Sequence, residues 1–274
     1  MTFCLGMKVK DGLIGIADTR ITTGAECITV KKVTLHHYGR YPMFLMTSGL
    51  RSVRDKALTY FSEVLEDSDN KFDKLYQAVN EFGKQIRRVA EEDGAALKKS
   101  SLDFNIHALI GGQLERDKEH KLFLLYPEGN WVEIAEGTPY HIIGSARYGK
   151  PILDRALHYE APMDFALKVG FLAFDATFQS ATDVSYPIDV VLYRFNTNDM
   201  VEHRYEKDDF REAASAWQEH IVQSVHHLPM GQLDSIFAKS LEVPHRPAQS
   251  LDTQWASALL TLVFENFTDR ALQP

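Results

Sequence analysis

The chain reads TFCLGMKVKDGLIGIADTR from residue 2 to residue 20, and this stretch decides how the rest of the fold is built. Apolar residues alternate with small or charged ones, and β-branched residues resume after Asp11-Gly12. Alternation on both sides of an Asp-Gly pair is typical of a β-hairpin. With these two residues as the loop, Asp18 is predicted to lie opposite Leu5, roughly 10 Å along the strand from Thr2.

The remaining sequence alternates between strand-like and helix-like periodicity, in the order strands, helix pair, strands, helix pair, strands. Strands are predicted at 28–35, 43–47, 104–112, 121–126, 130–135, 140–143, 188–195 and 200–205, and helices at 53–65, 72–89, 152–158 and 163–177. Each sheet needs a second layer to cover its apolar face. We therefore expect an α+β fold in which two stacked sheets are covered by helices on both outer sides.

The composition changes after residue 205, which divides the chain into a body at 1–205 and a helical C-terminal extension at 206–274. A helix is predicted at 210–225, and Trp255–Phe267 is strongly apolar at helical spacing. An apolar face of that size is uncommon on the surface of a monomer. We expect it to be buried against the body or against another subunit.

Composition excludes several classes of protein. The 30 basic and 38 acidic residues give a formal net charge of −8 without a basic cluster, so nucleic acid is not an expected partner. No apolar run reaches membrane-spanning length, and the first residues do not read as a signal peptide. The two cysteines show no metal-ligand spacing. We expect a cytoplasmic protein without a membrane partner, a metal or an organic cofactor.

Thr2 is the first candidate for chemistry, because an initiator Met is normally removed when so small a residue follows it. Removal would leave a hydroxyl and a free α-amine on one residue. An α-amine has an ordinary pKa of about 7.7–8.0, so part of it is neutral and can accept the hydroxyl proton. Thr2 is therefore predicted to act as both nucleophile and base, although a merely permissive second residue has the same appearance.

Asp18 is too far from Thr2 in the predicted register to serve it directly. A lysine from a neighbouring strand could span the gap, with its ammonium held by Asp18 and presented to the hydroxyl, where a cation favours the alkoxide. Lys32 is our candidate. Lys31 would point to the opposite face if that segment is a strand.

This constellation resembles the proteasome β-subunit family of N-terminal-nucleophile hydrolases. The resemblance runs from Thr2 through Asp18-Thr19-Arg20 and Gly24 to Lys31-Lys32-Val33 and Thr47-Ser48-Gly49. Within that family the chain looks most like the bacterial ancestral β-subunit group, often called Anbu. The resemblance implies a four-layer αββα fold, with Thr2 as nucleophile and Lys32 and Asp18 as its activators.

The same resemblance implies further site residues. A backbone N–H around Ser48 or Gly49 would stabilise the oxyanion, and the family's accessory serine corresponds to Ser145. Of its accessory Asp-x-x-Ser, Asp183 is present, but Tyr186 stands where the serine would be, so Ser185 is the substitute. The wall of the substrate pocket would include Ile21, Val30, Met46 and Leu50. That set is mostly apolar, which predicts a hydrophobic residue before the cleaved bond.

The expected activity is that of a threonine-type peptidase without metal or cofactor. Two alternatives remain open: hydrolysis of a small non-protein amide, and a self-assembling scaffold with little catalysis. The resemblance also implies a homo-oligomer, either an open helical arrangement or a closed ring, with the open form favoured.

Overall fold

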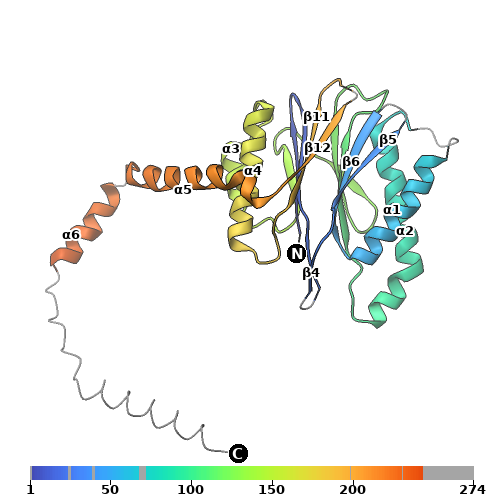
Figure 1. Ribbon diagram of the computed structural model, residues 1–274, viewed down its shortest axis with the longest axis horizontal. Coiled ribbons are helices and arrows are strands. Elements are labelled where there is room, and N and C mark those ends of the chain that lie inside the picture. The colour runs from blue at the N-terminus through green and yellow to red at the C-terminus, as the bar shows by residue number, and fades with distance from the viewer. Residues whose placement is uncertain are drawn as a thin grey trace, which may run out of the picture. The chain divides into compact units, whose positions relative to one another are not determined.

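Two five-stranded antiparallel sheets stack on each other in this computed structural model, which describes residues 2–23, 26–38, 41–67, 72–197, 199–229 and 231–242 (Figure 1). The first sheet has the order β10-β1-β2-β11-β12, with bounds Tyr140–Gly144, Phe3–Val9, Gly12–Asp18, Ile188–Arg194 and Met200–Tyr205. The second has the order β5-β6-β7-β8-β9, with bounds Val33–Tyr38, Tyr41–Gly49, Ile106–Gly112, Lys121–Leu125 and Trp131–Glu133. A separate hairpin joins β3 (Arg20–Thr23) to β4 (Glu26–Thr29).

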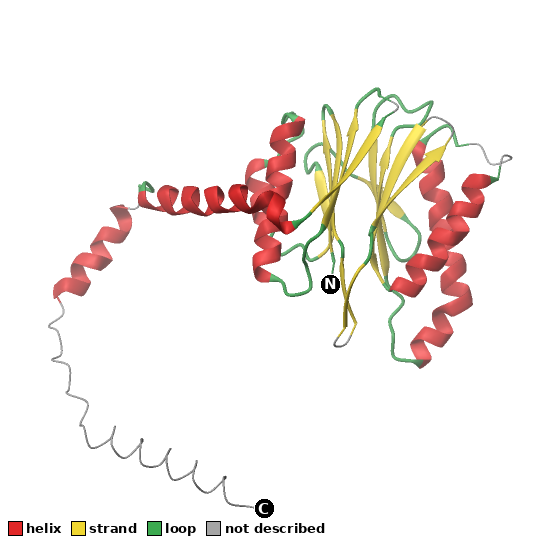
Figure 2. Ribbon diagram, viewed as in Figure 1, coloured by secondary structure: helices red, strands yellow, loops and turns green. Residues whose placement is uncertain are grey.

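Helices cover the outer face of each sheet (Figure 2). The pair α1 (Arg51–Glu66) and α2 (Leu75–Lys99) packs on the second sheet, and α4 (Met163–Ser180), with α3 (Lys150–Ala156) beside it, packs on the first. This is the αββα layering, which confirms the predicted fold class. The single strand predicted at 28–35 is two strands, β4 and β5, separated at residues 30–32.

The β1–β2 hairpin has a different register from the predicted one. Val9 pairs with Gly12, so the loop is Lys10-Asp11 rather than Asp11-Gly12. Gly12 has a φ of +151°, and a Cβ at this position would lie 1.9 Å from the Tyr193 carbonyl oxygen of β11. The glycine is therefore required inside the strand, where another backbone approaches closely, and not in the turn.

The corrected register moves Asp18 by two positions along β1. Cys4 pairs with Ala17, which places Asp18 next to Phe3 rather than opposite Leu5. The predicted gap between Asp18 and the start of β1 therefore does not exist, and the carboxylate lies one residue from Thr2.

Both faces of β1 are buried, one against α4 and the other against the second sheet. The alternation in the sequence of β1 follows from this difference. Phe3, Leu5 and Met7 belong to the hydrophobic cluster that includes α4. Cys4 belongs to the cluster between the sheets, and a Cβ on Gly6 would meet side chains of β7 and β8 at 3.2–3.3 Å. Small residues are thus needed on the face toward the second sheet, and large ones on the face toward the helices.

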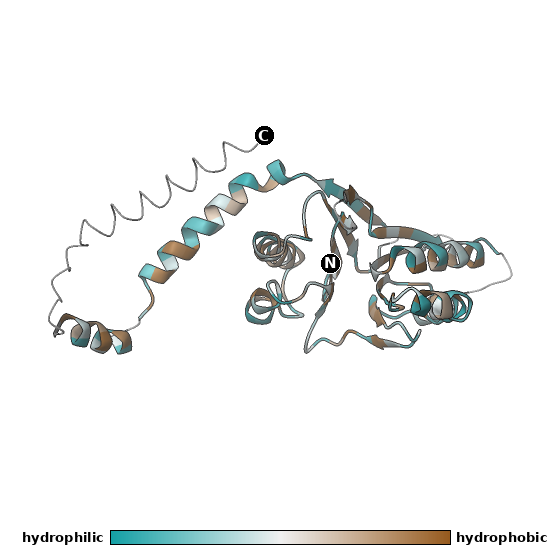
Figure 3. Ribbon diagram, turned by 90° about the horizontal axis from the view of Figure 1, so that it is seen from below, coloured by the Kyte–Doolittle hydropathy of each residue, from teal (hydrophilic) through white to brown (hydrophobic). Residues whose placement is uncertain are grey.

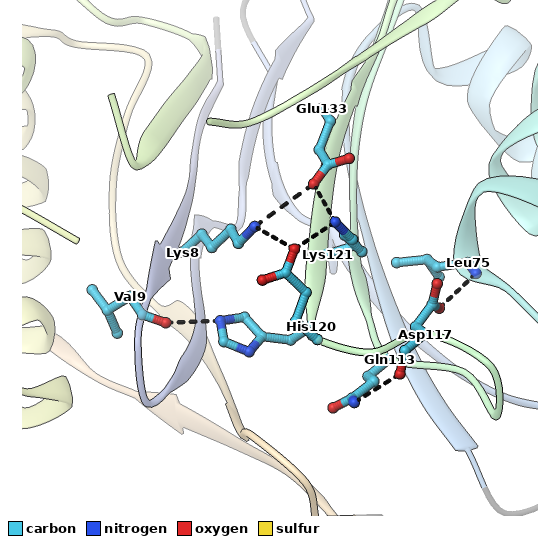
Figure 4. Close-up of polar contacts among 9 residues, drawn as sticks. Lys8, Val9, Leu75, Gln113, Asp117, His120, Lys121 and Glu133 are labelled. Carbon is cyan, nitrogen blue, oxygen red and sulfur yellow. Dashed lines mark hydrogen bonds and ion pairs between the residues drawn. The ribbon is translucent and has the colours of Figure 1, made fainter. Parts of the chain in front are cut away.

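A cluster of polar residues lies at the end of β1 that is opposite to Thr2 (Figure 4). The Lys8 ammonium, on a side chain only 3% exposed, lies 3.7 Å from a Glu133 carboxylate oxygen and 4.0 Å from one of Glu119. His120 bonds through Nε2 to the Val9 carbonyl oxygen at 2.7 Å, and its Nδ1 is buried without a partner in the described part of the chain. Burial lowers the pKa of His120.

Acid is expected to destabilise the protein partly through such histidines. Burial lowers the pKa of four of them, His36, His107, His120 and His141. As pH falls below about 6.5, these histidines bind protons in the unfolded chain before they do so in the folded one. The free energy of unfolding should therefore decrease as the pH falls. Denaturant titrations of His120→Gln at about pH 7 and pH 5 should show a weaker pH dependence than wild type. The exposed His158→Gln serves as the control, and an equal effect of both variants would contradict the assignment.

The residues after β12 form short helices. A 3-10 turn, η1 (Lys207–Phe210), leads into α5 (Arg211–His226), and a second turn, η2 (Gly231–Leu233), precedes α6 (Asp234–Glu242). The chain divides into two compact units, with a boundary within α5 between residues 216 and 217. The predicted division after residue 205 stays a prediction. Apolar residues recur along both helices (Figure 3), and those described there are largely exposed. Gly24 and Trp255–Phe267 lie outside the described residues.

Candidate active site

Thr2 is held by the loop that follows β10. The Ser145 backbone N–H donates to the Thr2 carbonyl oxygen at 2.7 Å. Gly144, the last residue of β10, has a φ of +95°, and a Cβ there would lie 1.9 Å from the same oxygen. The chain at Thr2 therefore approaches a position where only glycine fits. The loop fixes the backbone and leaves the half-buried threonine facing a cavity.

Asp18 lies at the end of β2 with its carboxylate fully buried. Its Oδ1 accepts a hydrogen bond from the Phe3 backbone N–H at 2.8 Å, and its Oδ2 accepts one from the Arg20 N–H at 3.2 Å. The same carboxylate thus ties the residue after Thr2 to the residue that begins β3.

Lys32 completes this group from the segment between β4 and β5. Its ammonium donates to Asp18 Oδ1 at 2.6 Å and to the Arg20 carbonyl oxygen at 2.7 Å, on a side chain 2% exposed. The neighbouring Lys31 turns outward and pairs with Glu202 of β12 at 2.7 Å. Although residues 31 and 32 belong to no strand, their side chains point apart, and only Lys32 joins Asp18.

The electrostatics of this buried pair have opposing contributions. Burial raises the pKa of Asp18, while the Lys32 ammonium and the N–H donors of Phe3 and Arg20 act in the opposite direction. Burial also raises the pKa of the Cys4 thiol far above its usual range. Cys4 is fully buried in β1, so it is a packing residue and no competing nucleophile.

A cavity of about 550 Å³ brings the candidate residues together. Its lining includes six predicted site residues: Thr2, Ile21, Lys32, Ser48, Gly49 and Leu50. Gly49 has a φ of +140°, and a Cβ there would lie 2.2 Å from the Asn105 carbonyl oxygen. The end of β6 is thus pressed against the chain before β7, with its backbone at the cavity wall.

Comparisons with known proteins identify solved structures with a similar fold. No protein-family model and no curated protein sequence matches the chain. Among solved structures, the Gly-1 mutant of Anbu from Hyphomicrobium sp. strain MC1 is 29% identical, with a TM-score of 0.76 over 83% of this chain and 98% of the other. Anbu (ancestral beta-subunit) from Yersinia bercovieri is 27% identical, with the same TM-score and coverage.

The chain is therefore similar in structure to Anbu proteins, the ancestral beta-subunits, over most of its length. A helical assembly of the Anbu complex from Pseudomonas aeruginosa has a TM-score of 0.78 at 24% identity, over 83% of this chain and 97% of the other. All three structures are matched almost completely, whereas about a sixth of this chain has no counterpart in them.

Several predicted site residues lie outside the cavity lining. Met46 is fully buried in the cluster between the sheets, because its side chain packs against Gly15 of β2. Val30 is half-buried, and its N–H bonds to the Thr19 carbonyl oxygen. Asp183 and Ser185 are half-buried in the segment before β11, away from the lining.

Tyr186 stands at the position where the resemblance implied a serine. Its ring makes edge contacts with Phe174 and Phe178 of α4, with centroids 4.9 and 5.2 Å away. Burial raises the pKa of its hydroxyl far above the ordinary value. Tyr186 therefore packs against the hydrophobic cluster under α4.

The cavity also contains residues to which the sequence analysis assigned no role in the site. They are Thr22, Thr47, Arg51, Ser52, Arg54, Asn105 and Gly144. Most come from the strand-to-helix junction of β6 and α1, which Thr47-Ser48-Gly49 already marked. The missed signal is the pair of arginines three residues apart, which lie on one side of a helix start. The described residues hold no group of three His, Cys, Asp or Glu side chains placed for a metal ion.

Proposed function

We propose that the protein is a threonine-type peptidase, with Thr2 exposed as the N-terminal nucleophile when Met1 is removed. The observation that carries this proposal is the buried Lys32–Asp18 pair. It is hydrogen-bonded to the residue after Thr2, and Lys32 lines the cavity that Thr2 faces. Burying two charges costs several kcal/mol per ion, and this cost is compatible with a functional requirement at that position.

The proposed chemistry uses only groups of the chain. The neutral α-amine of Thr2 takes the proton of its own Oγ, which attacks the substrate carbonyl, and the Lys32 ammonium favours the developing alkoxide. A backbone N–H near Ser48 or Gly49 donates to the tetrahedral oxyanion. The α-ammonium then protonates the leaving amine, and water releases the acyl group from the Thr2 ester. No metal or organic cofactor takes part in this scheme.

The accessory residues have smaller proposed roles. Ser145 holds the Thr2 backbone through its own N–H, and we propose that it orients the α-amine. Asp183 and Ser185 stay in the proposal as the accessory acid and hydroxyl. Their place before β11, and not in the cavity lining, favours an influence through neighbouring residues.

The proposal is tested by the mass of the protein and by its acylation. Intact-mass analysis of the purified protein should show loss of Met1, and a peptide vinyl sulfone should add once, at Thr2. A form that keeps Met1 has no free α-amine on Thr2 and should stay unlabelled. Labelling of that form, or of another residue, would contradict the mechanism. Digestion of a peptide library, set beside a panel of small acyl amides, distinguishes a peptidase from a small-amide hydrolase.

A self-assembling scaffold is the second candidate. The exposed apolar residues of α5 and α6, among them Val225, Phe237 and Leu241, favour association with another copy. The relative from Pseudomonas aeruginosa forms a helical assembly, and we propose an open homo-oligomer here as well. Sedimentation at two protein concentrations should show species larger than a monomer, and monomer alone at both would exclude assembly.

The location of the protein is also a proposal. Cys4 and Cys27 are both free thiols, which suits a reducing cytoplasm. Within the part of the chain that is described, every helix is too short or too polar to span a membrane.

A further inference from the structure

The cavity beside Thr2 is lined by three cations: Lys32, Arg51 and Arg54. Its described lining includes no carboxylate. Lys32 is compensated by Asp18 behind it. Arg51 and Arg54 have to share Asp55, whose two oxygens lie 3.3 and 2.7 Å from their nitrogens. Counting the ion pairs of these three lining residues, the cavity wall therefore carries one more positive than negative charge.

The start of α1 adds to this positive potential. Leu50, at the N-cap, makes no side-chain hydrogen bond to the first turn, and that turn contains no acidic residue. Leu50, Arg51 and Ser52 all line the cavity, so the unpaired N–H groups at the beginning of a 16-residue helix lie at its wall. A helix N-terminus without a capping side chain favours an anion.

Thr47 supplies an independent observation at the same cavity. The side chain is 2% exposed and lines the same cavity, and its Oγ1 has no hydrogen-bond partner among the described residues. A buried hydroxyl without a partner is costly, and most buried polar groups are satisfied. An acceptor entering the cavity would satisfy this hydroxyl.

We infer that this cavity binds an acidic side chain of the substrate, that of a Glu or Asp immediately before the cleaved bond. The inference rests on the proposed function and names its substrate class. Arg54 is the principal specificity residue, because its side chain is only 14% exposed and water screens it less than Arg51, which is 54% exposed. Ile21 and Leu50 contact the methylene groups of the substrate. The sequence alone predicted a hydrophobic residue at this place, because Arg51 and Arg54 were not recognised as pocket residues.

Two acyl-coumarin peptides that differ only in Glu against Gln before the coumarin test the inference. The pair has the same shape, so the ratio of kcat/KM reports the charge. The Glu peptide should be cleaved about 10- to 100-fold more efficiently, since hydrogen bonds to a charged group are the stronger ones. Added salt should reduce the ratio. A ratio of about one or below for the wild-type protein would overturn the inference.

Substitutions assign the preference to residues. Arg54→Gln should lower the Glu-to-Gln ratio to less than about 3, and Arg51→Gln, on a more exposed side chain, should lower it less. Lys56→Gln is the matched control, because this cation of α1 pairs with Glu92 and Asp93 and does not line the cavity. An unchanged ratio in Arg54→Gln, or an equal fall in Lys56→Gln, would contradict the assignment.

Failure of this inference is distinguishable from failure of the proposed function. Turnover that requires Thr2 but prefers the Gln peptide overturns the acidic specificity and leaves the hydrolase intact. Absence of turnover together with absence of vinyl sulfone labelling at Thr2 overturns both.

Discussion

Thr2→Ala should abolish acylation by a peptide vinyl sulfone and lower kcat/KM for peptide hydrolysis by about 10³-fold or more. The alanine variant keeps an α-amine but has no hydroxyl to attack a carbonyl. The loop that holds residue 2 bonds to its backbone carbonyl, so the substitution leaves that anchoring contact in place. Intact-mass analysis after incubation with the probe is the measurement.

Thr2→Ser is the matched control for that experiment. Ser and Ala are both small enough to permit removal of Met1, so the variants differ in the nucleophile and not in processing. The serine variant should keep labelling and part of the activity. Full labelling of Thr2→Ala would show that another residue is the nucleophile, and the mechanism proposed for this chain would fail.

Lys32→Met should destabilise the fold and remove the activity. The variant leaves the Asp18 carboxylate buried without its cation, and breaking a buried ion pair in this way costs about 3–5 kcal/mol. Chemical denaturation should show that loss in the free energy of unfolding. Because burial already raises the pKa of Asp18, the variant should bind a proton there more readily when folded. Its deficit relative to wild type should therefore increase as pH rises.

Lys31→Met supplies the comparison for that experiment. The neighbouring lysine forms an exposed pair with Glu202, and pairs of that kind contribute about 1 kcal/mol or less. A second control, Lys32→Met combined with Asp18→Asn, should recover part of the lost stability, because no buried charge remains. Equal destabilisation by Lys31→Met and Lys32→Met would contradict the assignment of the two lysines.

The sequence predicted the layered fold because its periodicities are local and strong. The alternation in β1 and β2 and the helical spacing in α1, α2 and α4 follow from which faces must be buried. The register of the first hairpin was wrong for a reason that is not local. Gly12 is needed for the close approach of β11, a strand almost 180 residues later, and not for the turn beside it.

The predicted site residues also separate into those that line the cavity and those that do not. Thr2, Lys32, Ser48 and Gly49 line one cavity, and they are the residues that stood in recognisable patterns. Met46 and Val30 were placed at the pocket by analogy, whereas the structure turns Met46 into the core between the sheets.

The sequence by itself determined the order of strands and helices, because the spacing of apolar residues shows which face of each element is buried. It also provided a small second residue, an acidic residue ending β2 and a lysine before β5. Only the tertiary structure decided that Asp18 bonds to the N–H of Phe3, that Lys32 rather than Lys31 reaches it, and that Arg51 and Arg54 border the cavity. These contacts join segments that are distant along the chain and meet only when the sheets pair and stack. No local sequence pattern therefore predicts them.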